Sequence, residues 1–488
     1  QLVGKTGEIL IKCLDNQVID KDDLIRYQKQ YNGERAQGFL ALKAAEAEKN
    51  TGKLANARFI LNEFVQKYPN SRYATVAKDR INDLDKSLTN QVNVGVLLPF
   101  EDNPDISNAI YSGIEFAVKK LQRNNNINIT LIKADCRTTV LDAIEAAEKL
   151  ASDYSIIGII GPLGRDQSSA VSLISKQYRI PTFSPTAEQS GIASLSEFFY
   201  QLSPDNYTKG TFIAEYAIGK LNLNSFAVMN AASGKSYEIA QGFMDRAELL
   251  GAKIVTNQIY YEGFNSLRDP FNAIRNAGIK KMFADSLIAE LPDIEQTEID
   301  SLYKLRMKAV NELAVINNRD VDSSRIEITS IDGIFLPISL NDNENIVAMM
   351  TNTYAGNFFK MQVFGNEDWL NENMFKNPNQ ARIMEGLTVF TSYYLNQNDP
   401  IFKNYLNDFR TMQQVTPEHF HTLGYRVGAF VFSGLQIDNN SRDVLNLNLS
   451  NKDAFETIGG RIDFNYKERV NSGTRILRLE NGAFKVIE

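Results

Sequence analysis

The chain has 488 residues, of which 43% are hydrophobic and 23% are charged, and its formal net charge is -7. A single hydrophobic core stops growing near about 250–300 residues, so we expect about three folded units. The acidic balance argues against nucleic acid as a partner, because phosphate binding depends on clustered Lys and Arg. No run reaches the ~18–20 apolar residues of a membrane helix, so we expect no membrane span.

Neither the first residue nor the cysteines identify a compartment. The sequence begins at Gln1 rather than Met, so we expect any signal peptide or lipid anchor to lie outside the given residues. The two cysteines, Cys13 and Cys136, are too few for a disulfide framework. They are expected to be free thiols, which is compatible with either side of a membrane.

The sequence offers no pattern typical of catalysis or metal binding. The two histidines, His419 and His421, are one residue apart and cannot share a helix face as zinc ligands at i and i+4 do, so we expect a loop or helix-start pair. Residues 233–236 (SGKS) resemble the end of a phosphate-binding loop, but Met229 stands where its first Gly is required. No nucleophile elbow is present. We therefore expect no enzyme, no metal and no cofactor.

Residues 34–87 predict three amphipathic helices, at 34–49, 52–68 and 71–87. In the second helix, apolar residues recur at the spacing of one buried face: Ile60, Leu61, Phe64, Val65 and Tyr68. The segment 69–71 (PNS) stops this helix and caps the next. The arrangement resembles tetratricopeptide repeats, whose unit is a helix pair of ~34 residues, so residues 1–90 are predicted to form a helical module. A plain helical hairpin without a binding groove is the alternative.

From residue 92 onward, strands alternate with helices, which predicts parallel, doubly wound sheets. The first series is strand 92–99, helix 107–123, strand 127–134, helix 140–153, strand 156–161, helix 167–177 and a strand from 182. The second is helix 207–220, strand 225–230, helix 237–250, strand 253–260, helix 267–277 and strands near 282 and at 331–337. The polar stretch 286–330 is predicted to be a helical insertion.

An ordered set of phrases in 92–488 resembles the type I periplasmic binding proteins, best known from the Leu/Ile/Val-binding proteins of ABC transporters. The phrases are 94–100 (VGVLLPF), 157–163 (IGIIGPL), 180–185 (IPTFSP), 203–205 (SPD), 332–337 (DGIFLP) and 460–464 (GRIDF). The resemblance implies an α/β fold of two doubly wound, Rossmann-like lobes joined by three hinge crossings. Lobe 1 would be 92–204 plus 378–445. Lobe 2 would be 205–377 plus 446–488, with the 286–330 insertion.

The resemblance also implies where a ligand binds. In amino-acid-binding members a Ser and a Thr hold the ligand carboxylate, and these positions fall on Arg165 and Glu188 here. Arg165 suits an anion and Glu188 a cation, or the two pair with each other. The full set of candidate ligand contacts is Phe100, Leu163, Gly164, Arg165, Ser168, Ser184, Pro185, Thr186, Glu188, Asp205, Tyr207 and Tyr237.

Three of these candidates have ordinary structural alternatives. Ser168 and Asp205 are each expected to cap a helix, since both residue types accept a hydrogen bond from a first-turn amide. Tyr237 matches a position whose ring covers the ligand in the family, and its alternative is packing at the rim of the cleft.

The family resemblance favours an extracytoplasmic receptor that captures a small polar ligand, amino-acid-like or a peptide fragment, by hinge closure for an ABC transporter permease. The alternative is an envelope interaction protein, because helical repeats ahead of this fold also resemble lipoprotein activators of penicillin-binding proteins, which are cell-wall synthases. Both hypotheses imply a periplasmic or outer-membrane-anchored location, with a lipid anchor outside the given sequence.

Overall fold

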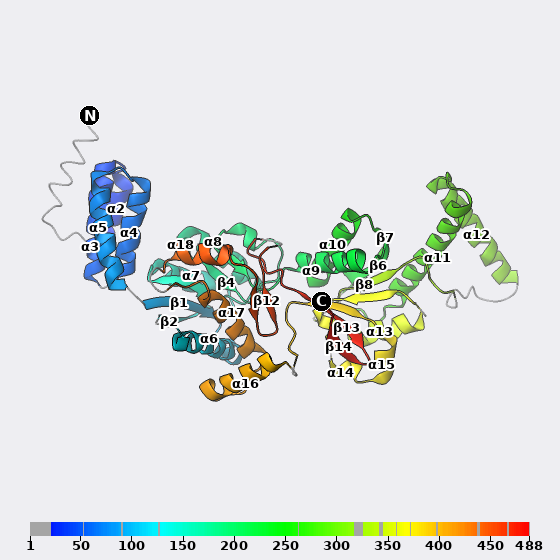
Figure 1. Ribbon diagram of the computed structural model, residues 1–488. Coiled ribbons are helices and arrows are strands. Elements are labelled where there is room, and N and C mark those ends of the chain that lie inside the picture. Colours follow the sequence, from blue (N-terminus) through cyan, green and yellow to red (C-terminus); the bar gives the residue numbers. More distant parts are fainter. Residues whose placement is uncertain are drawn as a thin grey trace. The chain divides into compact units, whose positions relative to one another are not determined.

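The computed structural model describes residues 21–51, 53–88, 91–124, 127–261, 263–316, 326–340, 345–357, 359–370, 372–396, 399–436, 440–465 and 468–487. The chain divides into two compact units (Figure 1). Unit 1 comprises Gln1–Ala187, Ile192–Leu202 and Asp399–Ile458. Unit 2 comprises Glu188–Gly191, Ser203–Asn398 and Gly459–Glu488.

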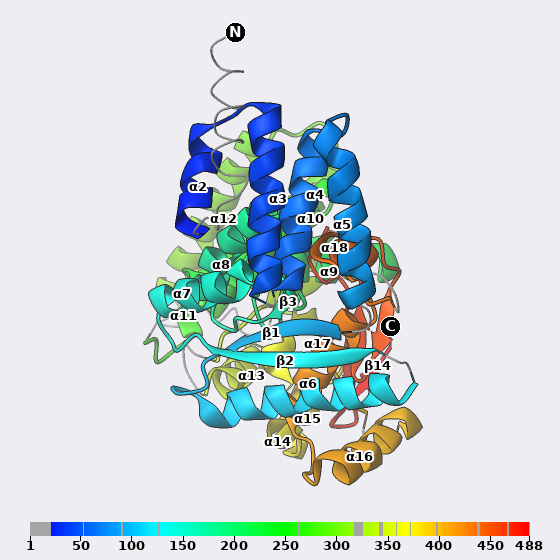
Figure 2. The same cartoon turned by 90° about the vertical axis from the view of Figure 1, so that its left-hand side faces the viewer.

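The N-terminal part of unit 1 is a helical bundle, seen in blue in Figure 2. Its helices are α2 (Lys21–Gln30), α3 (Glu34–Asn50), α4 (Leu54–Lys67) and α5 (Arg72–Leu88). The three predicted helices are confirmed, and α2 is an addition. Leu61 and Phe64 of α4 lie in the core of this bundle. The Phe59 ring stacks on Tyr154 with 3.6 Å between centroids, so the bundle contacts the α/β part of unit 1.

Unit 1 contains a parallel five-stranded sheet in the order β2-β1-β3-β4-β5. Its strands are β1 (Gln91–Leu98), β2 (Asn128–Asp135), β3 (Ile156–Ile160), β4 (Thr182–Ser184) and β5 (Phe199–Gln201). The helices are α6 (Pro104–Asn124), α7 (Val140–Ser152), α8 (Arg165–Tyr178), η1 (Ala193–Leu195), α16 (Pro400–Gln413), α17 (His419–Phe432) and α18 (Arg442–Ser450), and strand β11 (Phe455–Thr457) follows. Every residue of β3 is buried, as expected for a parallel strand covered on both faces.

Unit 2 contains a seven-stranded mixed sheet in the order β14-β13-β10-β9-β8-β6-β7. Its strands are β6 (Ser225–Ala231), β7 (Lys253–Tyr260), β8 (Gly333–Leu336), β9 (Gln362–Gly365), β10 (Thr388–Thr391), β13 (Arg475–Glu480) and β14 (Ala483–Val486), and β12 (Gly460–Ile462) lies outside this sheet. The helices are α9 (Asn206–Glu215), η2 (Tyr216–Lys220), α10 (Gly234–Leu249), α11 (Arg268–Glu290), α12 (Gln296–Ile316), α13 (Ile346–Gly356), η3 (Glu367–Trp369), α14 (Glu372–Phe375) and α15 (Pro378–Ile383). Strands β6 to β10 run parallel, and β13 and β14 are antiparallel to their neighbours.

The structure places two lobe boundaries later than the sequence predicts. Residues 378–398, predicted for lobe 1, belong to unit 2, because β10 pairs with β9 and β13 in that sheet. Residues 446–458, predicted for lobe 2, belong to unit 1, because α18 begins at Arg442 and that side chain donates to Ile156 O of β3. The strand predicted near Met282 is wrong, since this residue lies inside α11, while the helical character of the 286–330 stretch is confirmed for α12.

Each unit contains one helix pair that crosses at glycines. In unit 1 a Cβ on Gly113 of α6 would collide with the carbonyl oxygen of His421 in α17. In unit 2 a Cβ on Gly210 of α9 would collide with the carbonyl oxygen of Ile239 in α10. The same device therefore brings two helix backbones together in both units.

Replacing Gly210 with Ala should destabilise unit 2 by about 3 kcal/mol, because the obstacle is backbone that cannot rotate away. Urea unfolding followed by the fluorescence of Trp369, the only Trp of the chain, measures this change in unit 2. The matched control is Gly219→Ala, where no atom lies within 4 Å of the added Cβ. Equal midpoints for the two variants would contradict the close crossing.

Candidate functional site

Ligands of open α/β sheets bind beyond the carboxyl ends of the strands, so we consider those ends in each unit separately. In unit 1 the loops after β3 and β4 are tied together. Ser184 Oγ donates to Pro162 O at 2.8 Å, and Thr186 Oγ1 donates to Leu163 O at 2.9 Å. Both hydroxyls thus hold loop backbone, and the peptide between Gly161 and Pro162 is cis.

The remaining candidates of unit 1 lie around these loops. Gly164 is the N-cap of α8 and Arg165 is its first, exposed residue. The expectation that Ser168 caps this helix is wrong, because its buried hydroxyl lies 3.2 Å from Ser184 Oγ inside the unit. Pro185 is buried in the loop after β4. Phe100, after β1, packs edge-on against Tyr111, with 6.1 Å between ring centroids.

In unit 2 the ends of three adjacent parallel strands are cross-linked by polar side chains. Ser236, near the start of α10, accepts from Ala231 N of β6 and donates to Pro337 O after β8. Asn366, after β9, donates to Ile338 O and accepts from Ile338 N. These bonds fix the loops in which the charged residues of this unit sit.

Five charged residues form what we call the charged cluster: Glu188, Lys209, Lys235, Glu367 and Asp368. Lys209 Nζ lies 2.9 Å from Glu188 Oε1 and 2.6 Å from Glu367 Oε1. Lys235 Nζ lies 3.1 Å from both Glu367 Oε1 and Asp368 Oδ1, and 3.8 Å from Glu188 Oε2. Two ammonium groups are thus set against three carboxylates, which leaves one carboxylate in excess.

Burial strengthens the interactions between these charges, because only 2% of the Lys209 side chain and 21% of the Glu367 side chain are exposed to water. Burial opposes ionisation of Glu367, but Lys209 and Lys235 outweigh it and lower the pKa of this carboxyl. Burial also opposes the charge of Lys235, yet Glu367, Glu188 and Asp368 raise its pKa. For Asp368 burial prevails, so its pKa is raised although Lys235 lies close by. Asp368 is therefore less compensated by the two ammonium groups than Glu367 is.

The other candidates of unit 2 lie on the two helices beside the cluster. Asp205 caps α9 as expected, accepting from Thr208 N at 2.7 Å. Tyr207 is exposed at the start of α9, and its hydroxyl donates to Asp245 at 3.1 Å. Tyr237 lies in the first turn of α10, two residues after Lys235, and 42% of it is exposed. Its ring is therefore available at the end of the sheet that carries the cluster.

Sequence reasoning found only one member of the charged cluster, Glu188. The sequence instead places Lys235 in a segment that resembles the end of a phosphate-binding loop. A usable signal existed, because Lys235 follows the apolar strand β6 and the Glu367–Asp368 pair follows β9. What the sequence does not show is that these loops, together with α9, meet at one place.

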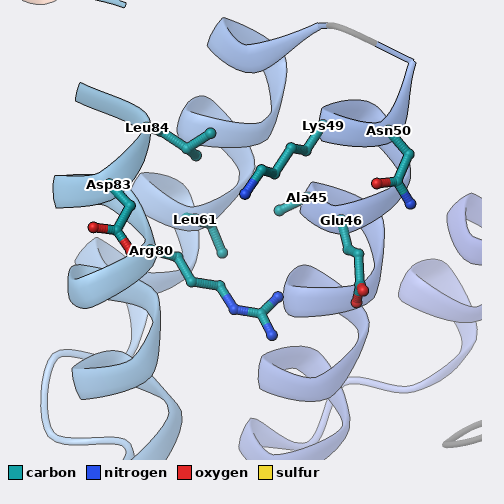
Figure 3. Close-up of a pocket in the computed structure, with 8 residues that line it drawn as sticks. All are labelled: Ala45, Glu46, Lys49, Asn50, Leu61, Arg80, Asp83 and Leu84. Atoms are coloured by element: carbon teal, nitrogen blue, oxygen red, sulfur yellow. The ribbon is translucent and has the colours of Figure 1, made fainter. Parts of the chain in front are cut away.

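A hollow lies in the helical bundle, away from any strand end. Its volume is about 300 Å³, and it is lined by Ala45, Glu46, Lys49, Asn50, Leu61, Arg80, Asp83 and Leu84 (Figure 3). Figure 3 shows Lys49 of α3 and Arg80 of α5 reaching toward the space between these two helices. The floor is apolar, because Ala45, Leu61 and Leu84 are buried.

Four further features can be stated for the described part of the chain. Within it, no helix is long and apolar enough to cross a membrane. The same residues contain no group of three or more His, Cys, Asp or Glu arranged to hold a metal ion. Cys136 is buried and in no disulfide, and burial raises the pKa of its thiol to about 12, whereas Cys13 lies outside the described residues. His419 begins α17 and His421 completes its capping box, which confirms the predicted helix-start pair.

Comparison with known proteins gives one family match and several structural ones. Residues 91–290 match the sequence profile of a family described as periplasmic binding proteins. No curated protein matches the sequence. A protein from Rhodospirillum rubrum, assigned to a branched-chain amino acid ABC transporter, has a TM-score of 0.60 at 17% identity, over 81% of this chain and 100% of that one.

Two solved structures with bound ligands are also similar. A substrate-binding protein of an ABC transporter from Desulfitobacterium hafniense, in complex with Leu, has a TM-score of 0.51 at 15% identity, over 81% of this chain and 100% of that one. A solute-binding protein from Rhodopseudomonas palustris, in complex with 3,4-dihydroxybenzoic acid, has a TM-score of 0.51 at 14% identity, over 80% of this chain and 93% of that one. These likenesses confirm the expected type I periplasmic binding fold.

Proposed function

Because residues 91–290 match the periplasmic binding proteins and the α/β units have the type I fold of that family, we propose that this chain is an extracytoplasmic solute-binding receptor that serves an ABC transporter. Such a receptor is a binding protein rather than an enzyme, and the proposal assigns no catalytic residue. It places the protein outside the cytoplasm, in agreement with the matched family.

The charged cluster carries the proposal for the ligand. It has one more carboxylate than ammonium groups, and Oε2 of Glu367 is buried with no hydrogen-bond donor among the described residues. A buried acceptor without a donor is unfavourable, so a ligand that brings N–H groups and a positive charge is stabilised there. We therefore infer a small polar solute with an ammonium or guanidinium group, with Asp368 as its nearest counter-charge and Tyr237 as a ring to cover it.

In unit 1, considered by itself, the loops after β3 and β4 remain candidate ligand contacts. Arg165 is exposed at the first turn of α8, where its guanidinium and the helix N-terminus both favour an anion. The hydroxyls of Ser184 and Thr186 are less suitable contacts, because both already bind loop carbonyls.

A thermal-shift screen of the purified chain against basic, neutral and acidic amino acids and short peptides tests the proposal. We expect shifts with basic compounds, and calorimetry should then show that Asp368→Asn weakens binding about 10- to 100-fold, as loss of a charged hydrogen bond does. Tyr237→Ala should weaken binding less. The matched control is Tyr261→Ala, an exposed Tyr elsewhere in unit 2. Tight binding of an acidic compound that both site variants leave unchanged would overturn this ligand class.

The second candidate function is an envelope interaction protein that activates a penicillin-binding protein. The observation that favours it is the helical bundle. The structural match to the Rhodospirillum rubrum protein covers 81% of this chain, so part of the chain has no counterpart in that structure. Direct binding of a purified penicillin-binding protein should then be abolished by Lys49→Glu with Arg80→Glu at the bundle hollow. No binding by the unaltered chain at micromolar concentration would remove this candidate.

A further inference from the structure

Helix α12 of unit 2 is attached to the fold along one face only. The Phe283 ring of α11 lies 5.6 Å from the Tyr303 ring and 5.2 Å from the Arg306 guanidinium. Lys280 of α11 adds an ion pair of 2.8 Å to Asp300. Figure 1 shows α12 beside the outer part of α11, away from the sheet of its own unit. Among the described residues of α12, only Ile299 is buried.

A second face of α12 is apolar and exposed. The exposed fractions are 37% for Leu302, 64% for Leu305, 58% for Leu313 and 77% for Ile316, and Ala309 is exposed between them. Their spacing of i, i+3, i+7, i+11 and i+14 places all five on one stripe of the helix. A stripe of large aliphatic side chains in water is unusual for a monomer and marks an interaction surface.

The order of residues along this stripe reads the same in both directions. Counting outward from Ala309, Leu305 and Leu313 lie four residues away, and Leu302 and Ile316 lie seven residues away. Two copies of α12 packed antiparallel about a two-fold axis at Ala309 would set large side chains against large ones. The small residue would lie at the closest approach of the two backbones. We propose that α12 docks on α12 of a second copy of this chain, forming a symmetric antiparallel helix pair.

Charges on the flank of the stripe support a second copy as the occupant. Lys308 and Glu312 lie on the same side of the stripe, 3.9 Å apart and both exposed. In an antiparallel pair related by this axis, equal flanks face each other, so Lys308 of one copy meets Glu312 of the other. A lipid surface fits less well, because Glu298, Asp300 and Glu312 balance the charge of Lys304, Arg306 and Lys308 on this helix.

Sedimentation and light scattering of the full chain test the pairing. We expect a species of twice the chain mass of 54.9 kDa at tens of micromolar. Leu305→Glu with Leu313→Glu should give the single-chain mass without changing the melting temperature, because both side chains lie outside the core. The control, Leu249→Glu on α10, is also strongly exposed and should stay dimeric. A single-chain mass for the unaltered protein would overturn the proposal, as would dimers that survive the double substitution.

Two further variants test the geometry. Ala309→Cys, with Cys13 replaced by Ser, should form a disulfide between copies on mild oxidation, whereas Val315→Cys on another face should not. Lys308→Glu alone and Glu312→Lys alone should each weaken the dimer several-fold, and the two together should restore it. Equal cross-linking at both positions, a failed restoration, or binding of α12 to anionic vesicles without dimers would each contradict the antiparallel pair.

Discussion

Replacing Lys209 with Met is expected to lower the free energy of unfolding of unit 2 by about 3–5 kcal/mol. The Lys209 ammonium is almost fully buried and lies within 3 Å of both Glu188 and Glu367. Removing it leaves Glu367 buried with Lys235 as its remaining cation, at 3.1 Å. A buried carboxylate that loses its main partner keeps its desolvation penalty, and this penalty is the reason for the large effect.

Trp369 gives a clean measurement of this loss, because it is buried in unit 2, next to Asp368 in the chain. Its fluorescence during urea unfolding reports unit 2 and not unit 1. The double variant Lys209→Met with Glu367→Gln removes both charges, so it should recover a large part of the lost stability. A double variant less stable than Lys209→Met would show that the two residues do not act as a pair.

The same pair sets a pH dependence. The pKa of Glu367 is lower in the folded chain than in the unfolded chain, because Lys209 and Lys235 outweigh burial. Its stabilising contribution is therefore complete above the unfolded pKa of about 4.3 and is lost as the pH falls further. In Glu367→Gln this part of the acid destabilisation should disappear. An unchanged acid profile of the Trp369 signal would contradict the assignment.

Replacing Arg442 with Met should lower the free energy of unfolding of unit 1 by about 3–5 kcal/mol, because the Arg442 guanidinium donates to four carbonyl oxygens. It donates to Ile156 O and Tyr178 O at 2.9 Å, and to Ala151 O and Asp153 O at 2.8 Å. The guanidinium also lies 4.3 Å from the centroid of the Tyr154 ring. Burial lowers the pKa of Arg442 to about 10, so it remains charged at neutral pH.

The matched control for this variant is Arg179→Met. Arg179 forms an ion pair of 3.0 Å with Asp443, the neighbour of Arg442, but both partners are about half exposed. Exposed ion pairs contribute about 0–1 kcal/mol to the free energy of unfolding, so Arg179→Met should change the stability of unit 1 little. Hydrogen exchange resolved at β3 follows unit 1, which contains no Trp. Similar losses in both variants would mean that the buried hydrogen bonds are not what holds α18 in place.

Arg442 also supports the contact between the helical bundle and the α/β part of unit 1. The ring that it covers, Tyr154, is the one on which Phe59 of the helical bundle stacks, and Tyr154 N donates to Asn56 Oδ1 at 2.7 Å. One residue near the C-terminal end of unit 1 therefore supports the contact that anchors the bundle. The second candidate function requires the bundle to bind a partner. The contact with Tyr154 would then attach the bundle, with its partner, to the α/β part of unit 1.

The sequence alone determined most elements and the fold. The strand predicted at 253–260 matches β7, the strand at 156–161 matches β3 to one residue, and Asp205 caps α9 as expected. These features depend on local causes, namely apolar periodicity and the hydrogen bond from a cap to the next turn. The family resemblance added the two-lobed architecture, which the structural comparisons confirm.

Only the tertiary structure decided which distant residues meet. The charged cluster joins Glu188, Lys209, Lys235 and the Glu367–Asp368 pair, which come from four separate segments. Pairing of charges depends on which loops the sheet order β9-β8-β6 brings side by side, and no local pattern encodes that order. Likewise, Ser168 looks like a cap in sequence, but it points into the unit toward Ser184, because the helix starts earlier, at Arg165. Local propensity fixes elements, whereas long-range packing fixes partners.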